Sequence, residues 1–229
     1  MRLVRRIVGL LDLVVPPTCA ACGIPGPVIC AACVAAVTVP HSVGCARCGH
    51  PWEVSTTRCS ECPPAIDRLQ FAAAYVDPVA TLIGALKDRG RRDLAGELAS
   101  LVATRCPSPD EGVCLTPVPL TRERERERGF NQAGLIAAHL AQAWGRPVVR
   151  LLERVRDDPP QRGASATARV VNVRGAFALA QRMPTPSEVW LVDDVCTTGA
   201  TLAACARALR RGGVKRIGAV CVARVMRQQ

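Results

Sequence analysis

The sequence predicts an α/β protein: a parallel sheet with helices on both faces, preceded by a small cysteine-rich module. Three observations predict this fold class. Four Cys-x-x-Cys pairs lie close together before residue 63, apolar strand-like runs alternate with helical stretches after it, and two adjacent acids follow one of those runs. The composition changes at Pro63-Pro64, so we expect a module over residues 1–64 and an α/β domain over residues 65–229.

Composition allows a packed core and excludes a disordered chain, because 49% of the 229 residues are hydrophobic and 21% are charged. The formal net charge of +11 favours partners that carry phosphate groups. Aromatic residues make up only 3% of the chain, which leaves few platforms on which nucleic-acid bases can stack.

Residues 1–16 superficially resemble a secretion signal, but Asp12 interrupts the apolar run, and Pro16 and Pro17 stand where small cleavage-site residues belong. The run is also too short to cross a membrane, so we expect no transmembrane segment. Its apolar residues fit one face of a helix: Leu3, Ile7, Leu10, Leu11 and Val14. We expect a short amphipathic docking helix in a cytoplasmic, reducing protein, with attachment to a membrane surface as the alternative.

The cysteine pairs predict two structural zinc ions. Two residues between thiolates let one tight turn present both sulfurs to the same tetrahedral ion, and two such pairs complete a site. The predicted ligands are Cys19, Cys22, Cys30, Cys33, Cys45, Cys48, Cys59 and Cys62. Sequential ribbons join the first four and the last four, and a cross-braced pairing is the alternative. The other five cysteines are expected to be core or loop thiols: Cys106, Cys114, Cys196, Cys205 and Cys221.

The elements of the second part follow from alternating patterns. Strands are expected at 71–76, 113–120, 189–192 and 217–223, and helices up to residue 86 and over 94–104, 132–144 and 200–211. Apolar strands separated by helices are typical of a parallel sheet covered on both faces. Ligands of such sheets bind at the carboxyl ends of the strands, so we look there for a site.

One of these strand ends predicts a site for a pentose 5-phosphate. Asp193 and Asp194 follow the run 189–192 and offer acceptors for vicinal sugar hydroxyls. The stretch after them opens a helix, and its amides, its hydroxyls and the helix dipole form a phosphate cradle. The cradle residues are Val195, Cys196, Thr197, Thr198, Gly199, Ala200 and Thr201. Gly199 is expected to let the backbone approach the phosphate without a Cβ in the way.

Two further segments are rich in cations. Residues 122–128 alternate Arg and Glu, which suits a solvated helix or strand, and Arg128 with the Gly-Phe-Asn-Gln that follows suits a pyrophosphate. Residues 154–174 are also basic, and Arg162 and Arg169 within them are expected to belong to a mobile hood over the phosphates.

The stretch 189–201 closely resembles the signature by which type I phosphoribosyltransferases bind phosphoribosyl pyrophosphate. This stretch is one of several segments that together resemble the ComF family over nearly the whole chain. The others are the cysteine pairs, Leu-Lys-x-Arg-Gly at 86–90, Pro-Val-Pro-Leu at 117–120, Arg-Gly-Phe-Asn-Gln at 128–132, Pro-Pro-Gln-x-Gly at 159–163 and Asn-Val-Arg-Gly-Ala-Phe at 172–177. The chain departs from that family at Asp158, Ala164 and Ala166, which puts acceptor binding more in question than phosphate binding.

The resemblance implies a type I phosphoribosyltransferase-like fold and a set of roles. Asp193 and Asp194 would hold the ribose hydroxyls, residues 197–201 the 5-phosphate, and magnesium would bridge pyrophosphate and ribose. Lys87 and Arg128 would neutralise the departing pyrophosphate. It also implies work on incoming single-stranded DNA with DNA-uptake or recombination proteins as partners.

Three functions remain open from the sequence. The first is a ComF-like protein that binds phosphoribosyl pyrophosphate and handles single-stranded DNA. The second, the alternative, is an active phosphoribosyltransferase of base or nucleotide salvage. The third is a zinc-ribbon module for protein interaction, which the intact phosphoribosyl motif disfavours. No acceptor pocket and no general base are evident in the sequence.

Overall fold

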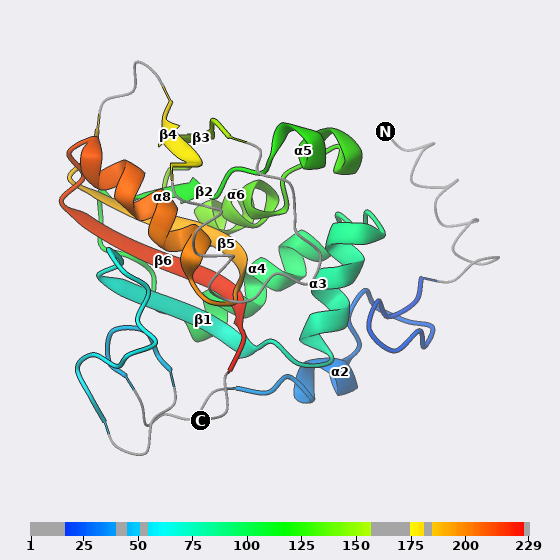
Figure 1. Cartoon of the computed structure of the whole chain (residues 1–229). Coiled ribbons are helices and arrows are strands. Elements are labelled where there is room, and N and C mark those ends of the chain that lie inside the picture. Colours follow the sequence, from blue (N-terminus) through cyan, green and yellow to red (C-terminus); the bar gives the residue numbers. More distant parts are fainter. Residues whose placement is uncertain (1–16, 40–44, 51–54, 157–174, 181–184, 227–229) are drawn as a thin grey trace.

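A computed structural model describes residues 17–39, 45–50, 55–156, 175–180 and 185–226. Its centre is a sheet of four parallel strands in the order β1-β6-β5-β2 (Figure 1). The strands are β1 (Arg68–Ala74), β2 (Cys114–Pro117), β5 (Glu188–Cys196) and β6 (Arg216–Arg224). The predicted helix of residues 1–16 lies outside the described residues.

Helices cover both faces of the sheet, which confirms the predicted fold class. On one face lie α4 (Leu94–Arg105) and α6 (Gln132–Trp144), and α3 (Val79–Asp88) packs beside α4 beyond the carboxyl ends of the strands (Figure 1). On the other face lies α8 (Ala200–Arg211), which Figure 1 shows crossing in front of the strands. The sequence patterns predicted the bounds of α6 and α8 correctly, since each helix begins at a polar or glycine cap and shows a clear apolar face.

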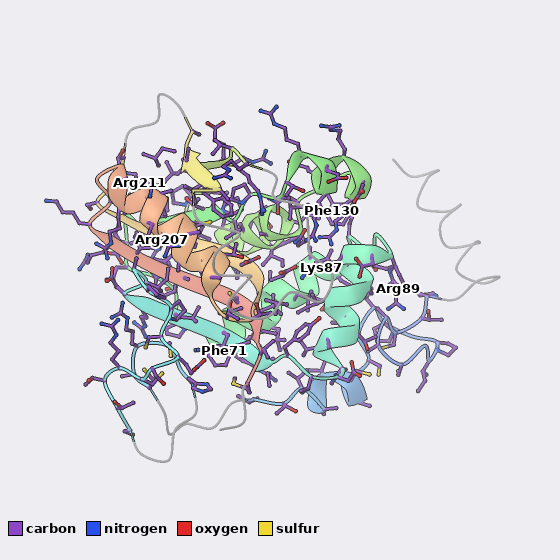
Figure 2. The ribbon with its side chains drawn as sticks, viewed as in Figure 1. Phe71, Lys87, Arg89, Phe130, Arg207 and Arg211 are labelled. Carbon is purple, nitrogen blue, oxygen red and sulfur yellow. The ribbon has the colours of Figure 1, made fainter. Side chains whose placement is uncertain are left out.

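Four short elements complete the fold: α2 (Ala31–Ala35), α5 (Arg122–Arg128), β3 (Leu152–Arg154) and β4 (Phe177–Leu179). The Arg/Glu run is a helix, α5, because the Thr121 hydroxyl accepts a hydrogen bond from the N–H of Arg124 and caps it. Figure 2 shows Phe130, just after α5, near Lys87 at the end of α3. The antiparallel pair β3–β4 was not predicted, because three-residue strands carry no readable alternation.

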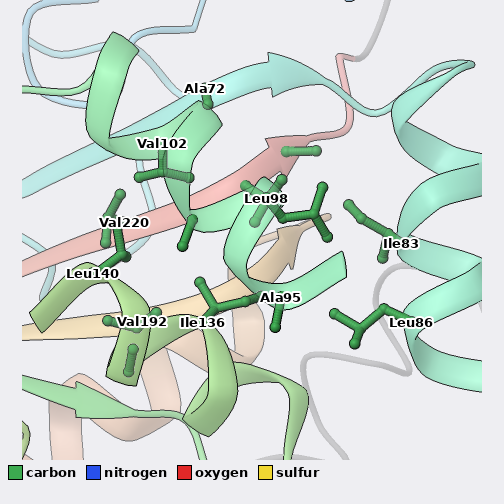
Figure 3. Close-up of a cluster of buried hydrophobic side chains, with 14 of the residues drawn as sticks. Ala72, Ile83, Leu86, Ala95, Leu98, Val102, Ile136, Leu140, Val192 and Val220 are labelled. Atoms are coloured by element: carbon green, nitrogen blue, oxygen red, sulfur yellow. The ribbon is translucent and has the colours of Figure 1, made fainter. Parts of the chain in front are cut away.

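The core forms two layers, because side chains of successive strand residues point to opposite faces of a sheet. In β5, Trp190 and Val192 join the cluster of α3, α4 and α6, while Val189 and Leu191 join the cluster of α8. Figure 3 shows the first of these clusters, in which Val192 lies opposite Ile136 of α6. Alanine, valine and leucine fill both layers, as the scarcity of aromatic residues requires.

The connections that follow β2 and β5 run toward opposite edges of the sheet. After β2, helix α6 leads outward to a bridge between Leu115 and Val148 at the edge, whereas after β5, helix α8 leads the other way to β6. Ligands of open α/β sheets bind where two such connections diverge at the carboxyl ends of strands. The loops after β2 and β5 therefore enclose the expected site.

The cysteine-rich segment packs along the other edge of the sheet. The N–H of Leu69 donates to the carbonyl of Arg47 at 2.8 Å, and the N–H of Ala74 donates to the carbonyl of Thr38 at 3.0 Å. Both halves of the segment are thus hydrogen-bonded to the edge strand β1. Within the part of the chain that the structure describes, no helix is long and apolar enough to cross a membrane.

Candidate functional site

The eight paired cysteines form two separate groups, one of Cys19, Cys22, Cys30 and Cys33 and one of Cys45, Cys48, Cys59 and Cys62. The pairing is therefore sequential, and the cross-braced alternative is excluded. In each group the sulfur atoms all lie within 4.8 Å of one another, for example 3.7 Å between Cys22 and Cys30 and 3.5 Å between Cys48 and Cys59. Tetrahedral thiolates at about 2.3 Å from zinc are about 3.8 Å apart, so both groups fit this ion.

The protonation of the cysteines also suits metal binding. Burial raises the pKa of Cys19 and of Cys45, but hydrogen bonds from backbone N–H groups outweigh it and lower each pKa to about 6. Burial and the neighbouring Cys48 raise the pKa of Cys59 to about 11. Each group thus offers a ready thiolate, and an arriving metal ion displaces the remaining protons.

The two groups differ in their surroundings. Cys22 of the first group is exposed, whereas all four cysteines of the second are buried. The second group belongs to the core layer that contains α8 and one face of β5, while residues of the first segment pack beside α3 and α4. His50 is buried and its carbonyl accepts a hydrogen bond from the N–H of Cys45, but the group of four sulfurs does not include its side chain. The five other cysteines are buried, as predicted for core thiols.

The acidic pair lies inside β5 and not beyond its end, which corrects the predicted strand boundary at residue 192. Strand β5 continues to Cys196 because it pairs with β6 as far as Arg224. Val195 and Cys196 are consequently strand residues, and the loop proper is reduced to residues 197–199 before α8 begins. Cys196 is buried, and burial raises the pKa of its thiol to about 11.

Lys87 connects α3 to the acidic pair. Its Nζ lies 2.8 Å from Oδ2 of Asp194, whose side chain is almost fully buried. Asp193 accepts a hydrogen bond of 2.9 Å from the N–H of Asp194. Burial and the charge of Asp194 raise the pKa of Asp193 to about 8, although Lys87 acts in the opposite direction. The pair thus shares negative charge at the switch point of the sheet.

This raised pKa predicts that the ligand-free protein loses folding stability as the pH rises. The stability that protonated Asp193 provides is complete below its unfolded pKa near 4 and is lost as the pH rises through about 8. We expect Asp193→Asn to unfold at the same temperature as wild type near pH 4 and about 2–4 °C higher at about pH 8.5. Differential scanning calorimetry of zinc-saturated protein measures this, with exposed Asp110→Asn as the control. A constant difference across the pH range would contradict the assignment.

The loop after β5 opens α8 as predicted, but Gly199 has a different neighbour. Its φ is +72°, and a Cβ there would lie 2.5 Å from Cγ of Pro63, the residue that follows Cys62. The missing side chain therefore makes room for Pro63 and the second cysteine segment. The Thr198 hydroxyl accepts a hydrogen bond from the N–H of Ala200, and Thr197 is exposed.

A cavity of about 430 Å³ lies between α3 and α5, and Lys87, the partner of Asp194, lines it. Its lining combines Lys87 and Arg128 with Arg124, and Phe130 forms part of its wall. Arg128 donates to the Gln132 side chain at 3.0 Å and lies 3.6 Å from Asp88. The structure thus brings together the predicted Lys87, Arg128 and Asp194, while Arg162 and Arg169 lie outside the described residues.

Arg124 was missed by the sequence reasoning. It lies four residues before Arg128, so the two share a helix face and line the same cavity. The signal was present in the alternating run, but it is readable only once the run is known to be a helix. Arg92, also missed, lies over the Phe130 ring at 4.7 Å and donates to the Gly129 carbonyl.

Comparison with known proteins gives two family matches, one for each part. Residues 127–229 match the phosphoribosyl transferase domain, and residues 10–63 match the double zinc ribbon domain. With the geometry of the two cysteine groups, the second match shows two zinc-binding sites of four cysteines each.

Relatives align over most of the chain. The DNA utilization protein YhgH of Salmonella typhi is 33% identical over 93% of this chain and its own whole length. Competence protein F of Haemophilus influenzae is 32% identical over 76% of this chain and 81% of its own. Competence protein ComFC of Bacillus subtilis is 29% identical over 74% of this chain and 72% of its own.

Proposed function

Because this chain belongs to the ComF family of phosphoribosyltransferase-like proteins with a double zinc ribbon, we propose that it binds phosphoribosyl pyrophosphate together with magnesium. One observation carries the proposal. Two carboxylates and a helix N-terminus lie at the switch point of the sheet, and Lys87 links them to a cavity whose described lining includes three cations. A ligand with a sugar diol, a monophosphate and a pyrophosphate matches all three features.

The acidic pair and the loop are proposed to hold the sugar phosphate. Asp193 and Asp194 offer acceptor oxygens for the ribose hydroxyls, and Asp194 already holds a cation in Lys87. The 5-phosphate is expected at the N-terminus of α8, where first-turn N–H groups and the hydroxyls of Thr197 and Thr201 are available. Carboxylates at this edge are also the hard oxygen donors that magnesium prefers, and the ion would offset charge between pyrophosphate and ribose.

The cation-rich cavity is proposed to hold the pyrophosphate. Among the described residues that line it, the cations Lys87, Arg124 and Arg128 outnumber the acids Asp88 and Glu127. Guanidinium groups bind phosphate oxygens through paired N–H donors, which gives orientation as well as charge. If the chain transfers the phosphoribosyl group, the same cations would stabilise the pyrophosphate as it leaves C1. An active phosphoribosyltransferase of base or nucleotide salvage is therefore the alternative function.

Thermal shift tests the binding of phosphoribosyl pyrophosphate, and pyrophosphate release tests the alternative of an active enzyme. Phosphoribosyl pyrophosphate with magnesium at about 100 times its dissociation constant should add about 2.7 kcal/mol, or about 5–10 °C in melting temperature. Asp193→Ala with Asp194→Ala should show no shift, and ribose 5-phosphate should give a smaller one. Absence of any shift in wild type would refute binding. Release of pyrophosphate with any base in a panel would establish the enzyme, and binding without release would leave a ligand-binding protein.

Handling of single-stranded DNA in the cytoplasm is proposed as the context of this binding. The relatives are named as competence and DNA utilization proteins, and the formal charge of +11 suits a polyanion. Few aromatic residues are available for base stacking, so phosphate contacts should dominate. Proteins of DNA uptake or recombination are the partners that this context suggests.

Salt dependence tests this part. The affinity for an oligo-dT strand should fall linearly with the logarithm of salt concentration, with a slope of about −0.7 for each phosphate contacted. Arg162→Ala with Arg169→Ala should weaken binding and flatten the slope by about one to two contacts. Arg91→Ala with Arg216→Ala removes the same charge at two partly exposed arginines that are paired with acids, and is the control. An affinity independent of salt would exclude the proposal.

A further inference from the structure

Arg224 is a buried cation that neither the sequence motifs nor the proposed ligand contacts explain. It ends strand β6 after a run of apolar residues, and only 3% of its surface is exposed. A guanidinium in such a place costs free energy unless hydrogen bonds and nearby negative charge compensate it. Its surroundings therefore indicate what it serves.

Its hydrogen bonds go to the second cysteine segment. Nη1 donates to the carbonyl of Cys48, a zinc ligand, at 2.5 Å, and Nη2 donates to the carbonyl of Glu61, next to the ligand Cys62, at 2.9 Å. The guanidinium also lies over the Phe71 ring, 5.7 Å from its centre. One side chain thus holds both knuckles of the same metal site.

Negative charge is the second part of the argument. Four thiolates around one zinc ion carry a formal charge of about −2, and this group is buried in the core of the protein. The guanidinium donates to the carbonyl of one ligand and to that of the residue before another, so its positive charge lies beside this group. The guanidinium and the second thiolate group therefore stabilise each other.

The third part is the position of Arg224 relative to the phosphate loop. In the register of the sheet it pairs with Cys196, the last residue of β5 before that loop. The loop residue Gly199 touches Pro63, which follows Cys62. The second metal site therefore contacts the loop on one side through Pro63, and Arg224 connects it to the strand that leads into the loop.

We propose that Arg224 is a positioning residue that neutralises the second zinc–thiolate group and fixes it against the phosphate loop, so that this metal site forms part of the phosphoribosyl site. The metal half of this inference stands on the cysteine geometry, and the ligand half rests on the proposed function. The first zinc site carries no part of this inference; among its described contacts, Ala20 accepts an exposed hydrogen bond of 3.3 Å from Arg89, just after α3.

Zinc release to a colorimetric chelator tests the metal half on the full-length holoprotein. Wild type should release zinc in a fast step from the first site, where Cys22 is exposed, and in a slow step from the second site, where all four cysteines are buried, and Cys22→Ser should lack the fast step. Arg224→Met should accelerate the slow step about 10–100-fold, the range found when outer groups around metal ligands are removed. Arg224→Lys, which keeps the charge, should lie between the two.

Arg216→Met is the matched control, because Arg216 begins the same strand β6 at its far, exposed end. It should leave both release steps unchanged. If the slow step of zinc release has the same rate in Arg224→Met as in Arg216→Met, the inference is overturned. The shift with phosphoribosyl pyrophosphate and magnesium is measured in parallel, and we expect Arg224→Met to bind about 10-fold more weakly.

Gly199→Ala tests the same coupling without touching Arg224, and it applies even if Arg224→Met does not fold. Its Cβ would press on Pro63, so the slow zinc step should accelerate, and adding Pro63→Gly should restore it. Gly145→Ala, at a φ of +63° in open space, is the control for backbone strain alone. Equal rates of zinc release in Gly199→Ala and Gly145→Ala would show that the second metal site and the phosphate loop are not coupled. If wild type fails to bind phosphoribosyl pyrophosphate, the proposed function falls, while the zinc measurements still decide the role of Arg224.

Discussion

Cys48→Ser is expected to lower the melting temperature by more than about 10 °C, whereas Cys22→Ser should lower it by only a few degrees. Structural zinc contributes directly to the free energy of folding, so losing it is costly wherever the folded chain depends on it. Cys48 is fully buried in the core layer shared with α8, and Cys22 is exposed at the surface. Loss of about 4 kcal/mol shifts a protein of this size by about 8–16 °C.

Calorimetry together with the zinc content of each variant measures this difference. Each variant should retain about one zinc ion, which shows that the losses come from different sites. Equal destabilisation by the two substitutions would mean that the first ribbon is as deeply integrated as the second. Cys205→Ser, at a buried core thiol outside both groups, controls for the polarity of serine.

Lys87→Met is expected to lower the melting temperature by about 5–10 °C and to abolish the shift with phosphoribosyl pyrophosphate. Removing the ammonium group leaves the buried Asp194 carboxylate without its cation, and one-sided loss of a buried pair costs about 3–5 kcal/mol. Lys87 is partly exposed, so the lower part of this range applies. Adding Asp194→Asn removes the unpaired charge and should restore most of the stability.

The double variant separates the structural role of the pair from its role in binding. It should be nearly as stable as wild type and still show no ligand-induced shift. Arg91→Met with Asp93→Asn provides the control, because that pair lies on the surface and exposed pairs contribute little. Recovery of the ligand shift in the Lys87→Met, Asp194→Asn protein would show that these residues do not bind the ligand.

The regular part of the fold could be read from the sequence. Periodicity and end signals placed α6 and α8 correctly, because Asn131, Gly145 and Gly199 mark their ends in residue types that favour caps. The ends of β5 could not be read in this way. The carboxylates of Asp193 and Asp194 look like a loop in sequence, and only pairing with β6 shows that the strand continues through them.

The candidate site was predictable where one short segment carries it and not where tertiary contacts complete it. The cysteine pairs indicated two metal sites, but only the folded chain decides that they pair sequentially. The close approach of Gly199 to Pro63 could not be predicted, because the two residues are far apart in sequence. Arg224 gave no signal at all, since a lone arginine after an apolar strand looks like a strand end at the surface.

The hydrogen bonds between the ribbons and β1 have a consequence for association between molecules. An edge strand with free N–H and C=O groups is a template on which another chain can add a strand. Here the carbonyl groups of Arg47 and Thr38 in the ribbons accept hydrogen bonds from N–H groups of β1. Arg105 donates to the Ala72 carbonyl of the same strand. The ribbons thus cover this border of the sheet, and we expect loss of zinc, which would loosen them, to expose a site for aggregation.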